Sequence, residues 1–385
     1  MKTTVGMGMA VAGVIGLSTF ANAADWQLRP TVAVGAEYDD NIRLAAKNEE
    51  STSGAWLTGA VEFGSESEIQ ETKGRLRLDF INYANSKVPD ENNQYFNFTT
   101  AHKGQLNTLR LDAAARRDTT IVTDRVPTSP EDIDVALTTT QVRRTRATIS
   151  PSWRHQLSQR TDVGMAYAYL GTTYDKNVLV DYHRHDLKLD VGHNLSERDR
   201  LTVNVGASDY RAPDANKKYD TVSVVGEYER HLSETFLGVI GVGARRTNFD
   251  IPGESNGQDS GAILRLRGER KGERTTWDGL VERSVYPSGS GDVVEADQLV
   301  LQVRHKLRPL LEFSMRARFL KQHSIVNNGS NQDTRYVYVE PKLAWLMSRE
   351  LSLSASYRYR RKSGEANTPS ADSNAAYVEL TYAAL

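Results

Sequence analysis

Hydrophobic and polar residues alternate one by one through most of the chain. The pattern is clear in residues 75–80 (RLRLDF), 313–319 (FSMRARF) and 351–360 (LSLSASYRYR), where apolar side chains occupy every second position. A period of two is typical of a β-strand whose two faces meet different surroundings. The chain is therefore predicted to be all-β.

A short polar motif recurs roughly every 38 residues in the last two-thirds of the chain, which indicates one repeated supersecondary unit. Its copies read HQLSQRTD (155–162), HNLSERDR (193–200), RHLSETF (230–236), RGERKGER (267–274), HKLRPLL (305–311) and AWLMSREL (344–351). Strand patterns lie on both sides of each copy, and long polar segments separate the pairs. We expect a single closed up-and-down antiparallel β-barrel of about 18 strands, with 16 possible.

The alternation of tight turns and long loops predicts the orientation of the barrel. Short turns belong to the periplasmic end of outer-membrane barrels, and long loops to the outside. Tyrosines flank most of the long loops, and two tryptophans lie near tight turns, which predicts two aromatic belts. Tyr83, Tyr174 and Tyr210 are out of phase with the apolar face of their strands, so they point inward or follow a bulge. Pro151 and Pro341 fall inside predicted strands, where a bulge would accommodate them.

Residues 1–23 resemble a cleaved signal peptide, with Lys2, an apolar stretch and the sequence Ala-Asn-Ala at 21–23. The barrel is then expected to occupy residues 24–385. No later uncharged run is long enough for a spanning helix, so a barrel is the membrane-spanning option. We therefore expect the chain to reach the Gram-negative outer membrane through the periplasm.

Composition narrows the classes of function. The 48 Lys and Arg residues balance 49 Asp and Glu residues, which gives no reason to expect a nucleic-acid partner. There are no cysteines, so thiolate metal sites and cysteine nucleophiles are absent. No cofactor is expected.

The residues Tyr38-Asp39-Asp40-Asn41-Ile42 and the turn 157–161 (LSQRT) resemble the putative β-barrel porin type 2 family. The resemblance extends over the mature chain and implies an outer-membrane barrel. Some members of that family serve as the exit for a secreted exopolysaccharide, which implies periplasmic polysaccharide-export proteins as partners. One departure is the C-terminus, Tyr-Ala-Ala-Leu, which lacks the final aromatic residue usual in such barrels.

The principal expectation for function is therefore exopolysaccharide export through the lumen. The alternative is a general or oligosaccharide-selective diffusion porin for small solutes. A structural barrel whose loops bind a surface partner is a third possibility.

Arginines concentrate on the face opposite the apolar one, where they are expected to line the lumen. They are Arg75, Arg77, Arg110, Arg265, Arg267, Arg316, Arg318, Arg358 and Arg360. An arginine ladder in a water-filled lumen would select anions. The competing interpretation is that these arginines pair with acidic side chains on the same face, as charged barrel interiors generally do.

Three smaller clusters have a chemical interpretation, but each has a plainer one. Residues 39–41 with Glu49 and Glu50 could bind Ca²⁺, although the spacing of a calcium loop is absent. His183 and His185 share a strand face without a third metal ligand nearby. The side chains of His323 and Ser324 are expected to point to opposite faces of a strand, so the two residues form no catalytic dyad by themselves. We expect no metal site and no enzymatic activity.

Overall fold

The computed structural model describes residues 26–120, 141–252, 257–289, 291–325, 334–364 and 370–384. The predicted signal peptide lies outside these residues. Within them, eighteen antiparallel strands follow one another around a single sheet, with one 3₁₀ turn, η3 (Pro213–Ala215). The strands are β1 (Trp26–Asp39), β2 (Thr52–Glu66), β3 (Gln70–Tyr83), β4 (Glu91–Lys103), β5 (Asn107–Thr119), β6 (Arg143–Gln156), β7 (Thr161–Tyr174), β8 (Tyr182–Asn194), β9 (Asp199–Ala212), β10 (Lys217–Ser233), β11 (Phe236–Asp250), β12 (Gly257–Lys271), β13 (Thr275–Pro287), β14 (Val293–Arg308), β15 (Leu311–Ser324), β16 (Thr334–Leu346), β17 (Leu351–Gly364) and β18 (Ala371–Ala383).

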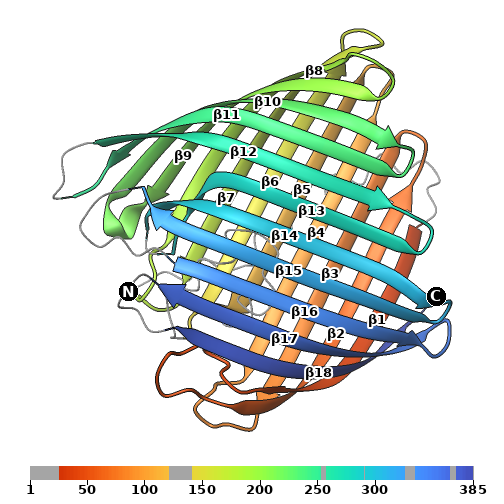
Figure 1. The fold of residues 1–385 in the computed structure, drawn as a ribbon, viewed down its shortest axis with the longest axis vertical. Helices are drawn as coiled ribbons and strands as arrows, with labels where there is room; N and C mark the ends of the chain where they lie inside the picture. The colour runs from red at the N-terminus through yellow and green to blue at the C-terminus, as the bar shows by residue number, and fades with distance from the viewer. Residues whose placement is uncertain are drawn as a thin grey trace.

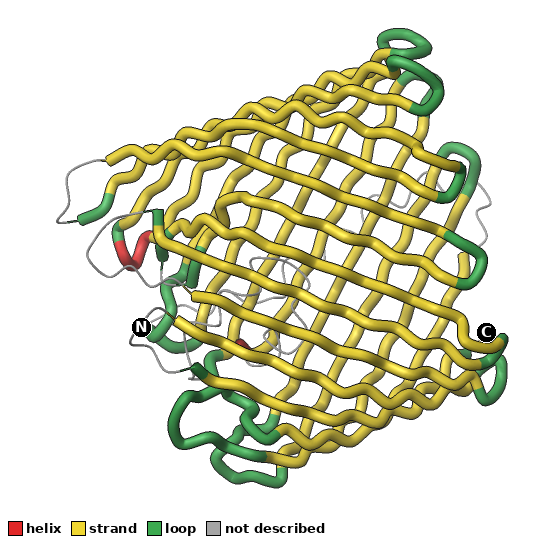
Figure 2. The backbone as a smooth tube through the Cα atoms, viewed as in Figure 1, coloured by secondary structure: helices red, strands yellow, loops and turns green. Residues whose placement is uncertain are grey.

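The sheet closes on itself. Each strand pairs with its neighbours in sequence, and β18 pairs with β1 from Ala383–Thr31 to Ala375–Asp39 (Figure 1). Figure 2 shows the result as a tilted mesh of strands, with tight turns at the right-hand end and longer connections at the left. The predicted closed up-and-down barrel of 18 strands is confirmed.

The two faces of the wall differ as the alternation predicts. On β12, Leu264 and Leu266 are exposed on the outside, whereas Arg265 and Arg267 point inward to Glu227 of β10 and Asp278 of β13. The same arrangement recurs around the barrel, and the exposed apolar residues form a continuous outer belt, among them Leu76, Leu78, Phe80, Leu187, Leu189, Val203, Val205, Val222, Val224, Ile240, Val242, Leu299 and Phe319. Such a belt is stable in contact with lipid and unfavourable in water.

The recurring Leu-Ser motif is a serine-capped turn. Ser158 Oγ accepts hydrogen bonds from the backbone N–H groups of Arg160 and Thr161 at 3.3 and 3.1 Å. Ser196 and Ser348 cap the equivalent turns in the same way. The short side chain satisfies donors that the tight turn leaves without ladder partners. This local geometry explains why the motif returns once per hairpin.

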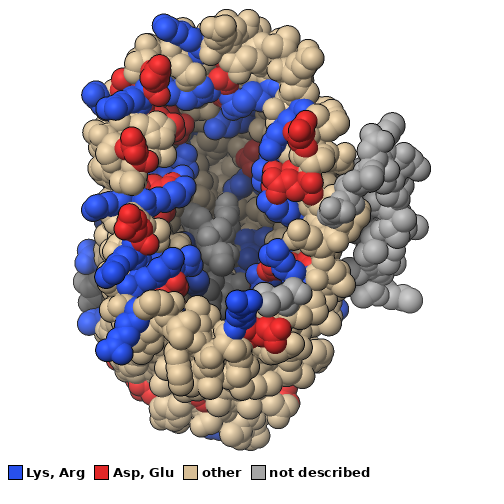
Figure 3. All heavy atoms as spheres, turned by 90° about the vertical axis from the view of Figure 1, so that its right-hand side faces the viewer, with Lys and Arg blue, Asp and Glu red and all other residues tan. Residues whose placement is uncertain are grey.

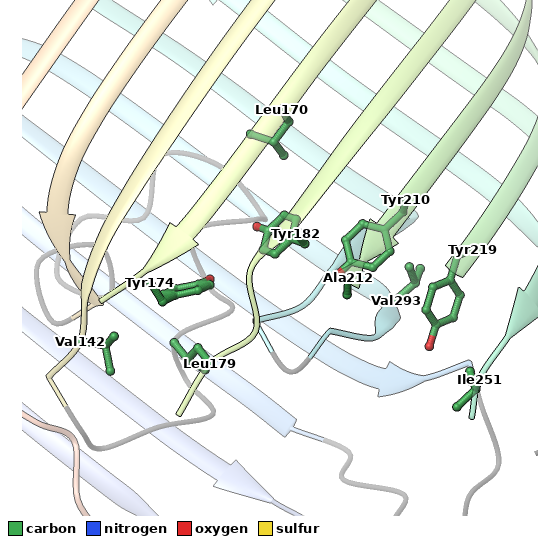
Figure 4. Packing of buried hydrophobic residues seen from close by; sticks show 10 residues of the cluster. All are labelled: Val142, Leu170, Tyr174, Leu179, Tyr182, Tyr210, Ala212, Tyr219, Ile251 and Val293. Carbon is green, nitrogen blue, oxygen red and sulfur yellow. The ribbon is translucent and has the colours of Figure 1, made fainter. Parts of the chain in front are cut away.

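Most tyrosines next to the long connections point inward rather than into an outer belt. The buried ones are Tyr83, Tyr174, Tyr182, Tyr210, Tyr219, Tyr336 and Tyr377. Tyr174, Tyr182, Tyr210 and Tyr219 belong to one cluster on the inner wall (Figure 4). The out-of-phase positions of Tyr83, Tyr174 and Tyr210 thus reflect inward burial, because an inward residue at this end packs beneath the connections.

Three prolines lie inside strands: Pro30 near the start of β1, which remains in register with Val61 of β2, and Pro151 and Pro341, which interrupt pairing without a bulge. Pairing of β6 with β7 skips Pro151, and pairing of β16 with β17 skips Pro341, yet the register on both sides of each gap is unchanged. The register shifts lie instead beside short turns, between His231 and Ser233 and between Lys306 and Arg308. A proline therefore costs a ladder bond here but leaves the alternation of faces intact.

Adjacent positions on β10 test the outer belt. Val224 is exposed on the outside, and Val225 points inward. We expect Val224→Arg to destabilise the folded barrel in lipid by about 2–4 kcal/mol, because a guanidinium is poorly solvated in hydrocarbon. The matched control Val225→Arg should cost much less, since its charge reaches the lumen. Urea titration of the folded fraction, read by heat-dependent gel mobility, measures both. Equal losses would mean that this part of β10 is not in contact with lipid.

Candidate functional site in the lumen

The nine arginines singled out from the sequence all lie on the strand face opposite the exposed apolar residues. Figure 3 looks at the short-turn end, where basic and acidic side chains alternate around a hollow. The lumen is therefore lined by charges of both signs.

Most of these arginines are paired with carboxylates. The closest pairs are Arg75–Glu62 (3.6 Å), Arg77–Asp79 (2.7 Å), Arg110–Asp112 (2.7 Å), Arg265–Glu227 (3.2 Å), Arg267–Asp278 (2.9 Å), Arg358–Glu340 (2.8 Å) and Arg360–Asp39 (3.0 Å). Arg316 lies opposite Glu340 in the register of β15 and β16 and interacts with it electrostatically, and Arg318 is buried. This pairing favours a mutually neutralised interior over an anion-selective ladder.

One region of the inner wall combines these charges with aromatic rings. It is a cavity of about 220 Å³ that spans the junction where β16, β17 and β18 meet β2 and β3 across β1. We call it the seam patch, and its lining residues are Trp56, Thr58, Arg77, Asp79, Ile81, Glu340, Lys342, Ser354, Ser356, Arg358, Tyr377 and Glu379.

A glycine positions the indole of the seam patch. Trp56 points inward from β2 and lies over Gly35 of β1, where an added Cβ would be 2.2 Å from Trp56 Cζ2. Only glycine leaves room for the ring against the wall at this point. The ring of Tyr377 lies beside the indole, with centroids 6.1 Å apart and a tilted geometry.

Arg358 organises the other half of the seam patch. Its Nε and Nη2 donate to Glu340 Oε2 at 2.9 and 2.8 Å, and Nη1 donates to the hydroxyl of Tyr377 at 2.6 Å. The guanidinium also lies 4.3 Å from the centre of the Tyr377 ring. Tyr338 completes the network by donating to Glu340 at 2.8 Å. The arginine therefore fixes both an aromatic ring and a carboxylate in place.

Across the patch, Asp79 connects two strands. It accepts hydrogen bonds from Arg77 Nε and from the hydroxyl of Thr58, both at 2.7 Å. Lys342 Nζ lies 3.6 Å from Glu379 Oε1, and this pair adds two more charged groups to the lining of the patch. Aromatic faces surrounded by fixed donors and acceptors are suited to a small polyhydroxylated solute, since a ring stacks on the aromatic surface while hydroxyls exchange hydrogen bonds with the rim.

Sequence reasoning did not single out Trp56 or Tyr377 as site residues, and Tyr377 was expected in an aromatic belt beside a long loop. The parity of β2 could have indicated the inward position of Trp56, since Leu57 next to it is on the apolar face. Their proximity depends on the β1–β18 closure, which brings the two ends of the chain together.

Side chains of the other candidate clusters already bind other residues of this chain. Asp39 binds Arg360 and Ser373, and Asp40 binds the amide of Asn374, so these oxygens are already engaged. His185 Nδ1 and the hydroxyl of Tyr167 share a hydrogen bond of 2.7 Å. His323 Nε2 lies 3.2 Å from Glu295 Oε1. Within the described residues no group of three or more His, Asp or Glu side chains is placed to hold a metal ion. In the same part of the chain, no helix is long and apolar enough to cross a membrane.

Substitution of Arg358 tests the internal network of the seam patch. We expect Arg358→Ala to destabilise the barrel by about 3–5 kcal/mol, because it leaves Glu340 buried without its counter-charge. Arg110→Ala on β5, which breaks only the half-exposed pair with Asp112, is the control and should cost under about 1 kcal/mol. Urea titration of both variants distinguishes them, and similar small losses would show that the Arg358–Glu340 pair contributes little.

Part of the chain matches a known family, and its fold resembles several solved outer-membrane barrels. Residues 270–384 match the family described as putative beta-barrel porin 2. No curated protein matches the chain. Similar solved structures include OccAB3 of Acinetobacter baumannii (TM-score 0.48, 10% identity, 94% of this chain and 99% of that chain covered) and OccK2 (OpdF) of Pseudomonas aeruginosa in complex with glucuronate (TM-score 0.49, 10% identity, 94% and 99% covered). The siderophore receptor PirA of Acinetobacter baumannii is also similar (TM-score 0.46, 8% identity, 94% and 81% covered).

These structural likenesses are too weak to carry functional detail. The family match covers the six C-terminal strands, β13 to β18, and the end of β12, and it confirms the resemblance there. Together with the closed wall and its apolar belt, it shows that the chain is a porin-like β-barrel of the Gram-negative outer membrane.

Proposed function

We propose that this barrel is a diffusion porin for small polar solutes and that the seam patch binds sugars on their way through the lumen. The observation that carries the proposal is the seam patch itself, an aromatic and charged surface on the inner wall of a closed barrel. Weak binding at such a surface raises the local concentration of a solute without holding it.

The paired charges of the remaining wall support the same function. An interior of alternating acidic and basic groups keeps water in the lumen and attracts neither sign strongly. Neutral or zwitterionic solutes can then pass without a large electrostatic barrier. A porin role also agrees with the family match.

Export of an exopolysaccharide, the principal expectation from the sequence, is not the function that we propose. The family match is to a model of beta-barrel porins, and it does not point to periplasmic export partners. An export barrel is expected to be silent in isolation, whereas a diffusion porin conducts steadily. A purely structural barrel would tolerate changes to the lumen without any transport defect.

Planar-bilayer recording tests the proposal directly. We expect steady single-channel conductance that maltose reduces in a concentration-dependent manner. Trp56→Ala should weaken the apparent affinity for maltose about fivefold, which corresponds to the loss of one aromatic contact. Trp153→Ala is the matched control, because this tryptophan is exposed on the outer face near a short turn. A silent barrel would contradict the porin function, and conduction that maltose blocks equally in both variants would contradict the sugar site.

Ion selectivity gives a separate prediction. Because most luminal arginines are neutralised by carboxylates, the reversal potential in a KCl gradient should lie close to zero. Arg316→Glu should shift it toward cation selectivity, because it replaces a positive charge of the inner wall by a negative one opposite Glu340. Strong selectivity of either sign in the unmodified protein would show that charge pairing does not control permeation.

A further inference from the structure

The wall of the barrel is incomplete between β12 and β13. These strands pair only from Leu264–Arg283 to Lys271–Thr276. β12 nevertheless continues its pairing with β11 as far as Gly257, and β13 continues with β14 as far as Pro287. Residues 257–263 and 284–287 therefore face each other without a hydrogen-bonded ladder at the long-connection end. We call this gap the side opening.

The connection after β13 explains the gap, because it folds into the barrel instead of extending away from it. The carbonyl of Gly289 accepts a hydrogen bond from the backbone N–H of Val180 at 2.9 Å. Asp292 binds Lys217 Nζ at 2.6 Å and the hydroxyl of Tyr219 at 3.0 Å. These contacts draw the end of β13 toward the inner wall of β8–β10 and away from β12.

An arginine occupies the gap. Arg245 of β11 donates from Nη1 to Asp259 and from Nη2 to Glu295 of β14, both at 2.5 Å. Its side chain is only 2% exposed, and its Nε has no hydrogen-bond partner within the part of the chain that the structure describes. Gly261 makes room for the guanidinium, since a Cβ there would lie 2.8 Å from Nη2. The guanidinium thus connects β12 with β14 across the gap, and its Nε–H remains available to a further acceptor.

Two cavities meet at Arg245. The outer one is lined by Ser260, Arg283, Glu295, Lys321 and His323, and the inner one opens among Ile263, Ser284, Val285, Tyr219 and Val293. The side opening therefore lies between the outer surface and the lumen. The buried guanidinium of Arg245 lines the cavity on each side of it. The exposed residues Leu264, Val281, Leu299 and Phe319 lie directly below its outer mouth and belong to the apolar belt.

We propose that the side opening is a lateral binding site for single-chain amphiphiles that carry a carboxylate. The carboxylate binds Arg245, taking up the free Nε–H and displacing Glu295 from Nη2, while the alkyl chain lies along the apolar belt. The exchange replaces one carboxylate by another at the same guanidinium, so the charge of the pair is preserved. The site is independent of the proposed passage of sugars through the lumen.

Single cysteines test this proposal cleanly, because the natural chain has none. Ile263→Cys and, as a second variant, Ser284→Cys place a thiol at the inner mouth, and Val225→Cys places one on the lumen side of fully paired strands. In proteoliposomes a maleimide attached to a lipid headgroup should label the first two and spare the third. A small water-soluble maleimide should label all three, which confirms folding and access from the lumen.

Dodecanoate then probes the ligand. We expect it to slow labelling of Ile263→Cys by the lipid-linked reagent, and Arg245→Gln should abolish this protection. Glu295→Gln should lower the half-protecting concentration about tenfold, as expected when one competing charge-assisted hydrogen bond is removed. Dodecyl maltoside, which has no acid group, is the control. Lipid-linked labelling no faster than in Val225→Cys would overturn the opening, and labelling that dodecanoate leaves unchanged would overturn the carboxylate site.

Discussion

A backbone that crosses lipid has no water with which to satisfy its N–H and C=O groups, so every one of them must find a partner within the protein. This requirement accounts for the closed ladder of eighteen strands and for the pairing of β1 with β18. At the tight turns, which lie beyond the lipid, Ser158, Ser196 and Ser348 provide side-chain acceptors for N–H groups outside the ladder. The side opening is notable because it relaxes this requirement at one place, next to a buried arginine.

Once the strand pairing is fixed, the alternation of side chains determines which residues contact lipid and which contact water. Outward residues meet lipid and are apolar, whereas inward residues meet water and are charged, as Leu264 and Arg265 illustrate on consecutive positions. Charges inside are then numerous enough to pair with each other. The seam patch and the paired arginines both follow from this alternation of strand faces. The seam patch is rich in aromatic rings, and the rest of the inner wall is rich in ion pairs.

Sequence alone predicted the architecture well because it depends on local patterns. Period-two alternation identifies strands, and the Leu-Ser turns mark hairpins, so strand number and the facing of Arg265 or Arg358 follow without knowledge of distant contacts. The seam patch could not be predicted, since Trp56 and Tyr377 are brought together only by closure. The tyrosines expected in an outer belt were misplaced for a related reason, because the inward position of Tyr219 involves Asp292 in the connection after β13. The gap beside Arg245 leaves no mark in the local pattern of β12.

Closure of the barrel has a kinetic consequence. Every hairpin pairs neighbours in sequence and can form early, but the β1–β18 junction joins opposite ends of the chain and must overcome the largest loss of chain entropy. Arg360 and Asp39 form their buried pair across this junction, and Trp56 meets Tyr377 beside it. An unclosed chain would therefore have strands and turns but no seam patch, so solute recognition would arise only at the last step of assembly.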